Sequence, residues 1–153
     1  MELKFAPRAI FEQILEFAVI PTFDLVIEVA PKSVIIVRRK IAPYKDVWAL
    51  PGLRMYKPEG IEDALTRIAR VEVGLAIDAS KRRFLGQFVG RFRTEHQRQD
   101  LSTGFAVRAK RGAPTMNEDH FTDLRLIRSA REIPKDTGAM YRYYLKGYFG
   151  AKP

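Results

Sequence analysis

The sequence predicts an α/β (α+β) domain in which a mixed β-sheet is packed between helices. Runs of β-branched residues of strand length alternate with stretches of helical apolar spacing, in the order α-β-β-β-α-β-β-β-α. No internal repeat or linker interrupts this order. The 153 residues fit one domain with its own core, so we interpret residues 1–153 as a single domain.

The N-terminal part predicts one helix followed by a strand hairpin. Residues 9–18 carry apolar side chains at helical spacing, and Pro21 ends that segment because proline interrupts a helix. Residues 24–30 and 33–39 are β-branched runs on either side of Pro31-Lys32, which we interpret as the turn of a hairpin. We expect an exposed edge on this hairpin, where two copies of the chain would pair.

The middle of the chain predicts an amphipathic helix over residues 60–75, after a short strand over 47–50. Glu72 interrupts its apolar stripe, four residues after Ile68. A carboxylate that points toward a core shifts its pKa, pairs with a cation or binds a metal. The stripe itself consists of Ile61, Ala64, Leu65, Ile68, Val71 and Leu75.

The C-terminal half predicts three more strands and a closing helix. Residues 83–92 and 101–109 have strand character on either side of a polar loop, and 124–127 are a candidate last strand. Residues 116–123 form a polar, acidic loop between them. From Gly138 onward, the spacing of apolar and tyrosine side chains predicts a helix.

Composition excludes several classes of protein. The chain is 46% hydrophobic and 29% charged, which is typical of a globular domain. It has no apolar run near the roughly 18 residues of a membrane span and no signal-type segment, so we expect a cytoplasmic protein that does not enter a membrane. The absence of cysteine excludes disulfides and thiolate zinc sites.

The net charge of +9 and pI near 10.0 favour an anionic partner, either a phosphorylated small molecule or nucleic acid. Basic residues occur in local groups at 38–40, 81–83 and 91–98, and none forms a tract typical of a nucleic-acid-binding tail. Dispersed charge of this kind is usually a solvated surface.

Residues 47–75 resemble the Nudix box of the Nudix hydrolases, G-x5-E-x7-R-E-U-x-E-E-x-G-U, where U is a bulky aliphatic residue. Aligned without a gap, Glu59 falls on the first glutamate, Arg67 on the arginine and Gly74 on the closing glycine. The preceding WALPG resembles the W-x-x-P-G that commonly leads into the box. The resemblance implies a Nudix fold, with helices on both sides of the mixed sheet, and a hydrolase activity.

The box lacks most of the carboxylates that hold divalent metals in the family. The three glutamate positions of R-E-U-x-E-E are occupied by Ile68, Val71 and Glu72, and Leu53 replaces the first glycine. One carboxylate cannot hold two or three Mg²⁺ ions close together, because each requires near-octahedral oxygen coordination. Two interpretations follow: a degenerate Nudix fold, or a variant that uses one metal ion.

Within the superfamily, the retained Glu72 resembles the pattern of the GDP-mannose mannosyl hydrolases, which cleave the bond between sugar C1 and oxygen. In that family a histidine in a late loop, directly after a metal-ligating side chain, is the general base. The resemblance therefore implies His120 as the base and Asp119 as a metal ligand, together with Glu72 and the main-chain carbonyl of Gly52. The implied cofactor is Mg²⁺, with Mn²⁺ as the alternative.

The same resemblance implies four residues on the substrate side. Arg39 and Arg54 align with arginines that act on the substrate, so we assign them both catalytic and binding roles. Asp24 and Phe105 align with further substrate contacts. The implied partner is a nucleotide sugar or another small molecule with a nucleoside diphosphate, and the implied assembly is a homodimer.

Three functions remain open at this point. The first is a Mg²⁺-dependent hydrolase that cleaves a GDP-mannose-like sugar nucleotide at C1, and the second is a conventional pyrophosphohydrolase of a nucleoside diphosphate derivative or triphosphate. The third is a catalytically degenerate domain that binds a nucleotide or RNA, which the loss of carboxylates and the charge of +9 suggest. Glu59 and Arg67 are interpreted as a structural salt bridge near the helix start and on its outer face.

Overall fold

The longest strand, β1 (Ile20–Ala30), lies at the centre of a mixed sheet in the computed structural model, which describes residues 1–42 and 44–151. β1 pairs with β2 (Ser33–Arg39) in antiparallel orientation and with β6 (Gln99–Arg108) in parallel orientation. Seven strands of the described residues form the sheet in the order β3-β2-β1-β6-β5, while β4 pairs with β1 and β7 with β2. These other strands are β3 (Trp48–Ala49), β4 (Gly52–Arg54), β5 (Arg83–Arg91) and β7 (Phe121–Ile127).

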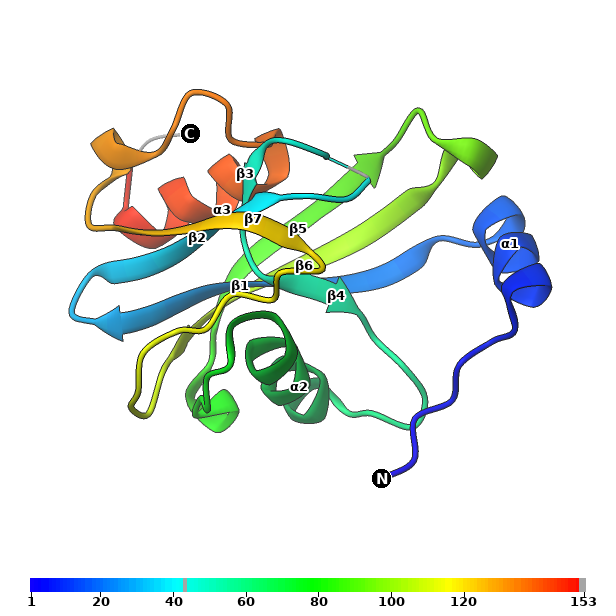
Figure 1. The fold of residues 1–153 in the computed structure, drawn as a ribbon, viewed down its shortest axis with the longest axis horizontal. Helices are drawn as coiled ribbons and strands as arrows, with labels where there is room; N and C mark the ends of the chain where they lie inside the picture. Colours follow the sequence, from blue (N-terminus) through cyan, green and yellow to red (C-terminus); the bar gives the residue numbers. More distant parts are fainter. Residues whose placement is uncertain (43, 152–153) are drawn as a thin grey trace.

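Helices lie on both sides of this sheet. Figure 1 shows α2 (Ile61–Val73) against one face and α3 (Ala139–Phe149) against the other, while α1 (Arg8–Phe17) lies apart, beside the β5–β6 connection. The predicted fold class, a mixed sheet between helices, is confirmed. Among the described residues no helix has both the length and the apolar character required to cross a bilayer. The described residues also contain three single turns of 3₁₀ helix: η1 (Ala79–Lys81), η2 (Glu95–Gln97) and η3 (Ala130–Glu132).

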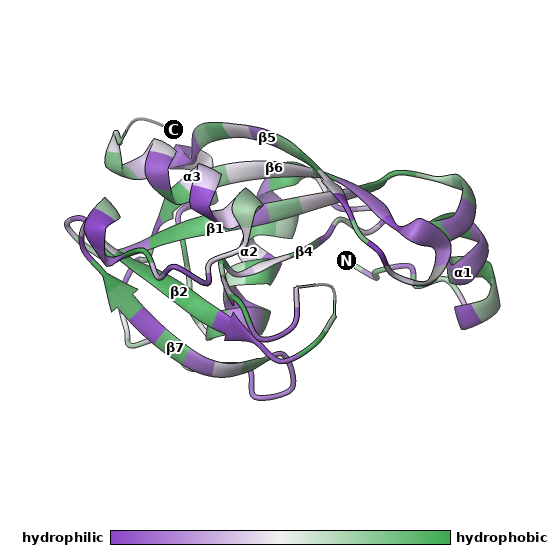
Figure 2. Cartoon of the chain, turned by 90° about the horizontal axis from the view of Figure 1, so that it is seen from above, coloured by the Kyte–Doolittle hydropathy of each residue, from purple (hydrophilic) through white to green (hydrophobic). Residues whose placement is uncertain are grey.

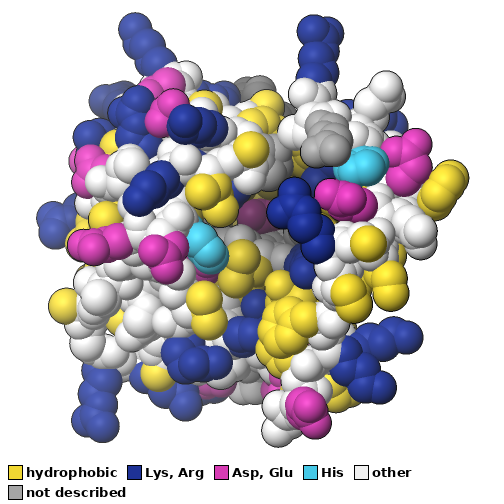
Figure 3. Space-filling model, turned by 45° about the vertical axis from the view of Figure 1, so that its right-hand side comes forward, with side chains coloured by type: hydrophobic (Ala, Val, Ile, Leu, Met, Phe, Trp, Pro, Cys, Tyr) yellow, Lys and Arg dark blue, Asp and Glu magenta, His cyan; other side chains and the backbone are white. Residues whose placement is uncertain are grey.

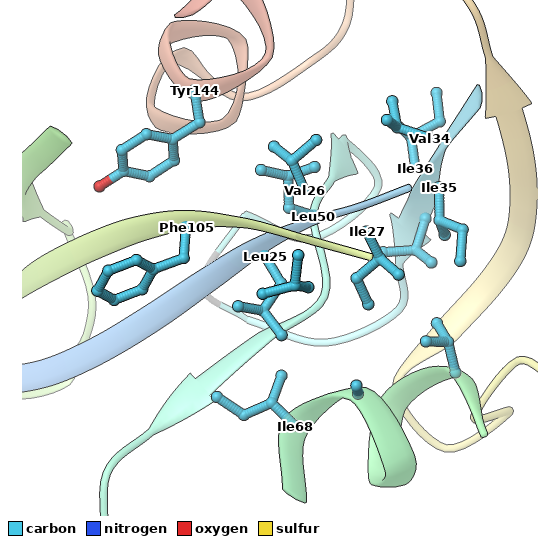
Figure 4. Packing of buried hydrophobic residues seen from close by; sticks show 14 of the residues in the cluster. Leu25, Val26, Ile27, Val34, Ile35, Ile36, Leu50, Ile68, Phe105 and Tyr144 are labelled. Carbon is cyan, nitrogen blue, oxygen red and sulfur yellow. The ribbon is translucent and has the colours of Figure 1, made fainter. Parts of the chain in front are cut away.

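The core forms on both faces of β1 and β2. Leu25, Val26 and Ile27 are consecutive and fully buried, so neither face of this strand meets solvent. Ile68 packs from α2 on one side and Tyr144 from α3 on the other (Figure 4). Strands covered on both faces are continuous apolar runs, as the colouring of β1 and β2 in Figure 2 shows. Complete burial of one such aliphatic side chain contributes about 1.5–3 kcal/mol.

Strand β4 has no counterpart among the predicted elements, because its pairing partner is distant along the chain. Gly52 lies opposite Asp24 of β1 in an antiparallel register. A Cβ atom at position 52 would lie 2.2 Å from Oδ1 of Asp24, so glycine is required for this approach. The role predicted for Pro21 is also wrong, since this proline lies inside β1, and α1 has already ended at Phe17.

The expectation of an exposed hairpin edge is wrong. The predicted hairpin forms, but β1 and β2 are interior strands, because β6 and β4 pair with β1 while β7 and β3 pair with β2. Other strands therefore cover both outer sides of the hairpin. The hairpin consequently offers no edge for the pairing of two copies.

The helix of the box is shorter than predicted and its buried face is different. α2 ends at Val73, where Gly74 adopts a left-handed conformation (φ 65°). Helical spacing places Ile61 and Val71 in the buried stripe, but their side chains are 40% and 37% exposed. Glu72 is 1% exposed, so the inward position expected for this carboxylate is confirmed.

Candidate active site

A cleft of about 230 Å³ opens on the face where α1, β4 and the end of α2 meet the loop before β7. Figure 3 shows this side of the molecule, hollowed near its middle, with basic and hydrophobic side chains around the hollow. The structure brings most of the residues predicted for the site into the lining of this cleft. These residues are Asp24, Arg39, Gly52, Arg54, Glu72 and His120.

Glu72 and His120 form a direct pair in the cleft. Oε1 of Glu72 lies 2.5 Å from Nδ1 of His120, and the Glu72 side chain is only 2% exposed. Burial raises the pKa of Glu72, while the neighbouring His120 and Arg39 oppose that rise. A carboxylate bonded to Nδ1 orients the imidazole and leaves Nε2 as the atom that can accept a proton. The inward carboxylate of α2 thus has a histidine as its partner.

Asp24 lies in the floor of the cleft and has a second hydrogen-bonded network behind it. Ser102 Oγ donates to Asp24 Oδ2 at 2.5 Å, and Tyr144 Oη lies 2.9 Å from the same hydroxyl. Burial raises the pKa of Asp24 to about 7, although the Ser102 bond and the charge of Arg39 lower it. No local sequence pattern points to Ser102 or Tyr144, because they come from β6 and α3 and meet Asp24 only in the fold.

The arginine at position 54 is held between two aromatic rings. Its guanidinium carbon lies 3.8 Å from the centre of the Phe11 ring and 4.8 Å from that of Tyr56. Cation–π contacts of this kind stabilise by about 0.5–1 kcal/mol at exposed sites. The sequence alone does not identify Phe11 or Tyr56 as site residues. Phe11 has the spacing of an ordinary apolar helix face. Arg39, at the end of β2, lines the same cleft.

The predicted salt bridge between Glu59 and Arg67 is confirmed, but it is buried and not on an outer face. Arg67 Nε and Nη2 contact the two carboxylate oxygens of Glu59, and Nη2 also donates to the main-chain oxygen of Arg54 at 2.8 Å. Both residues are less than a tenth exposed. Burial disfavours the charged form, but the bonds from Arg67 and from the N–H of Tyr56 outweigh it and lower the pKa of Glu59. The pair therefore ties the start of α2 to the end of β4, where Arg54 lies.

Two residues predicted for the site do not line the cleft. Phe105 is 7% exposed and packs in the core against Phe23 and Phe84, because side chains alternate along β6 and this one falls on the α2 side of the sheet (Figure 4). Asp119 is exposed in the turn before β7, where its N–H is bonded to the Asn117 side chain. Neither placement supports the contact expected with substrate or metal.

The side chains of the cleft do not form a metal centre by themselves. Among the described residues there is no group of three His, Asp or Glu side chains that could hold an ion. A multi-metal site therefore does not fit. A single Mg²⁺ is often held by one or two carboxylates together with substrate phosphates. Glu72, with one oxygen engaged by His120 and one remaining, fits that second arrangement.

Comparison with known proteins identifies the family. The model for the NUDIX domain matches residues 20–146, which include every strand and all of α2. The chain belongs to the Nudix family. The predicted class of activity, a hydrolase, is confirmed at the level of this family, whose members act on nucleoside diphosphate derivatives and generally use divalent metal ions. No curated protein sequence matches the chain.

Solved structures show the same fold at low sequence identity. A MutT Nudix hydrolase from Burkholderia pseudomallei has a TM-score of 0.73 and 19% identity, covering 84% of this chain and 96% of that one. The Nudix domain of NrtR from Shewanella oneidensis, in complex with ADP ribose, has a TM-score of 0.68 and 15% identity, covering 95% and 92%. A bifunctional NMN adenylyltransferase/ADP ribose pyrophosphatase from Francisella tularensis, with AMP and a manganese ion, has a TM-score of 0.61 and 21% identity, covering 82% and 39%.

Proposed function

We propose that this Nudix domain hydrolyses a nucleotide sugar of the GDP-mannose type at sugar C1, with His120 as the general base. The pair formed by Glu72 and His120 in the cleft carries the proposal. In this pair Nδ1–H of the imidazole donates to the carboxylate, so Nε2 is available for the proton of an attacking water. Among the described residues no hydrogen bond occupies Nε2 of His120.

The reaction is an inverting substitution at carbon. Water adds its oxygen to C1 while the bond from C1 to the diphosphate oxygen breaks, and the electron pair leaves with the nucleoside diphosphate. His120 Nε2 takes one proton of the water and later releases it to solvent. Arg39 and Arg54 both line the cleft, where their charges stabilise the diphosphate as negative charge develops on it.

A divalent ion bound with the substrate would add further positive charge at the leaving group. We propose Glu72 as the side chain that would hold it and the Gly52 carbonyl as its main-chain ligand, with Mg²⁺ favoured over Mn²⁺. The Phe11–Arg54–Tyr56 stack holds one phosphate-binding cation in a fixed orientation. The cleft of about 230 Å³ is smaller than the roughly 300–1,000 Å³ of common ligand pockets, so part of the substrate extends out of it.

A conventional pyrophosphohydrolase is the second candidate. Two of the similar structures favour it, since one includes an ADP ribose pyrophosphatase and another binds ADP ribose. In that reaction water attacks phosphorus and no bond to C1 breaks. The residues of the cleft are the same, and only the atom that receives the water differs.

Hydrolysis in water labelled with heavy oxygen distinguishes the two reactions. We expect nucleotide sugars incubated with the protein and Mg²⁺ to release free sugar that carries the label, with none in the nucleotide. Label in a phosphate product would overturn the proposal and support the conventional pyrophosphohydrolase. Tight nucleotide binding without turnover, unchanged by Glu72→Gln, would show a binding domain in place of an enzyme.

A further inference from the structure

A second and larger cavity lies at the opposite end of the molecule from α1. Its volume is about 1030 Å³, and it lies among the β1–β2 turn, η1, the end of β7 and the last turn of α3. In Figure 1 these segments gather at the left end, while α1 lies at the right. None of the residues that line this cavity also lines the cleft with Glu72 and His120.

The cavity concentrates positive charge. Six basic and two acidic side chains line it, which leaves a surplus of four positive charges in a chain of net charge +9. The fold therefore brings basic residues that are dispersed along the sequence, including two of the local group at 81–83, to one cavity. The basic residues come from separate segments around the cavity: Lys32, Lys81, Arg83, Arg108, Lys110 and Arg128.

Only part of this charge is neutralised within the protein. Glu28 pairs with Arg108 at 3.3 Å, and Asp78 pairs with Lys81 at 3.7 Å. Across residues 1–42 and 44–151, the other four basic side chains have no carboxylate within 4.0 Å. Cations without a carboxylate in contact, around a concave surface, attract a ligand with several negative charges.

Two aromatic side chains, Tyr148 and Phe149, line the cavity beside these basic residues and form an aromatic wall. The rings of Tyr148 and Phe149, both partly exposed, lie 4.9 Å apart in an edge-to-face arrangement at the end of α3. The hydroxyl of Tyr148 donates to Glu28, and the guanidinium carbon of Arg83 lies 5.6 Å from the centre of its ring. These contacts fix the wall. Aromatic rings beside a basic groove are the arrangement that binds single strands, through base stacking and phosphate contacts.

We propose that this cavity binds a short stretch of single-stranded nucleic acid, with phosphates on the basic rim and a base against Tyr148 and Phe149. A strand fits better than one nucleotide, because the volume reaches the upper limit of pockets for single small molecules, about 1,000 Å³. The cations are also spread around the rim and not gathered at one point. A duplex is disfavoured, since its bases are stacked on each other and cannot reach the aromatic wall.

Fluorescence anisotropy of labelled strands of about 12 nucleotides, RNA and DNA, with the full chain tests the proposal. We expect saturable binding that weakens as salt rises from about 50 to 200 mM. The double variant Lys110→Ala/Arg128→Ala should bind roughly tenfold more weakly. The slope of log affinity against log salt concentration should become shallower by about 1.4, because each phosphate contact on a single strand contributes about 0.7 to that slope.

A matched variant controls for net charge. Lys45→Ala/Lys135→Ala also removes two exposed cations, but neither lines the cavity, so its affinity should stay within about twofold of the unaltered protein. Tyr148→Phe keeps the ring and should retain binding, whereas Tyr148→Leu should weaken it. Hydrolysis in the cleft should be unchanged in the Lys110→Ala/Arg128→Ala variant.

Three results would overturn the proposal. The first is no binding of either strand, and the second is an equal loss in the cavity variant and the matched variant, which would show a general charge effect. The third is displacement of the strand by AMP together with loss of binding in Arg54→Ala, which would place the strand in the other cleft. None of these results depends on turnover, so they are separate from a failure of the proposed hydrolysis.

Discussion

Oε1 of Glu72 lies 2.5 Å from Nδ1 of His120, although 48 positions separate the two residues in the chain. The backbone holds them together, because the N–H of Asn117 donates to the Glu72 carbonyl at 3.0 Å and its side chain donates to the Val71 carbonyl at 3.2 Å. The loop before β7 is thus bonded to the last turn of α2. The pair is consequently a fixed part of the fold.

Replacement of either partner should reduce hydrolysis more than it reduces stability. We expect His120→Ala to lower kcat by about 10²–10⁴-fold, the usual contribution of a general base. Glu72→Gln should also lower kcat, because an amide no longer holds the imidazole as a carboxylate does. Steady-state kinetics with a nucleotide sugar measures both. Val71→Ala, one residue from Glu72 and partly exposed, is the control and should keep normal kcat.

The buried pair of Glu59 and Arg67 should be important for stability. Arg67→Ala leaves the Glu59 carboxylate buried without its cation, which costs about 3–5 kcal/mol of unfolding free energy. Urea denaturation measures this loss. Arg70→Ala removes an exposed arginine from the same helix and should change the unfolding free energy by less than about 0.5 kcal/mol. Equal effects of the two substitutions would contradict a structural role for the pair.

A side chain at position 52 should disturb both the sheet and the cleft. In Gly52→Ala the new Cβ would lie 2.2 Å from Asp24 Oδ1 and 2.7 Å from the Phe23 carbonyl, so β4 has to move. Overpacking of this kind costs about 1–3 kcal/mol. We expect a lower Tm and weaker substrate binding. At Gly147, inside α3, a Cβ meets no atom of the described residues outside the helix's own backbone within 4 Å, so Gly147→Ala should not lower the Tm and should leave substrate binding unchanged.

Asp24 should make stability fall as pH rises. Its pKa of about 7 in the fold exceeds the ordinary 3.8, mainly because of burial, so between these values the folded state binds more protons than the unfolded state. The stabilising contribution is complete below about pH 4 and is lost as pH rises through about 7. A tenfold difference in proton affinity corresponds to about 1.4 kcal/mol, so the loss is on the order of a few kcal/mol.

Comparison with Asp24→Asn isolates this contribution from those of other titrating groups. The unfolding free energy of the variant, measured in urea at about pH 5 and pH 8, should decline less with pH than that of the unaltered protein. Identical pH dependence in the two proteins would show that Asp24 titrates normally.

The stack around Arg54 should affect substrate binding. Phe11→Leu removes one ring from this cation, a contact that stabilises by about 0.5–1 kcal/mol, so KM should rise about two- to fivefold while kcat changes little. Phe17 lies on the same helix, is 86% exposed and does not line the cleft. Phe17→Leu is therefore the matched control, and a similar rise in its KM would contradict the role of the stack.

Local patterns in the sequence predict most of the fold. The β-branched runs of β1 and β2 and the helical spacing of α2 are properties of neighbouring residues, which is why those elements are predictable. β4 is not, because its three residues gain strand structure only through pairing with β1. The exposure of Val71 is not predictable either. Helical spacing shows that Val71 shares a face with the buried residues of α2, but it does not show how much of that face the rest of the protein covers.

The candidate site is predictable where a motif carries it. A family resemblance places Glu72 and His120 together, and the structure brings them into contact. Phe105 and Asp119 come from the same resemblance, but the structure puts the first in the core and the second in solvent, because a match in sequence does not fix where a side chain points. Ser102, behind Asp24, could not be predicted, because hydrogen bonds between distant strands leave no local pattern.

The position of α1 has a consequence for the shape of the cleft. This helix buries none of its residues, yet it supplies Phe11 to the cleft, and it lies before residue 20, where the match to the family begins. One wall of the cleft is therefore formed by a segment that lies outside the residues matched by the family model. Substitutions on α1 can therefore reshape this side of the cleft with no change to the central sheet.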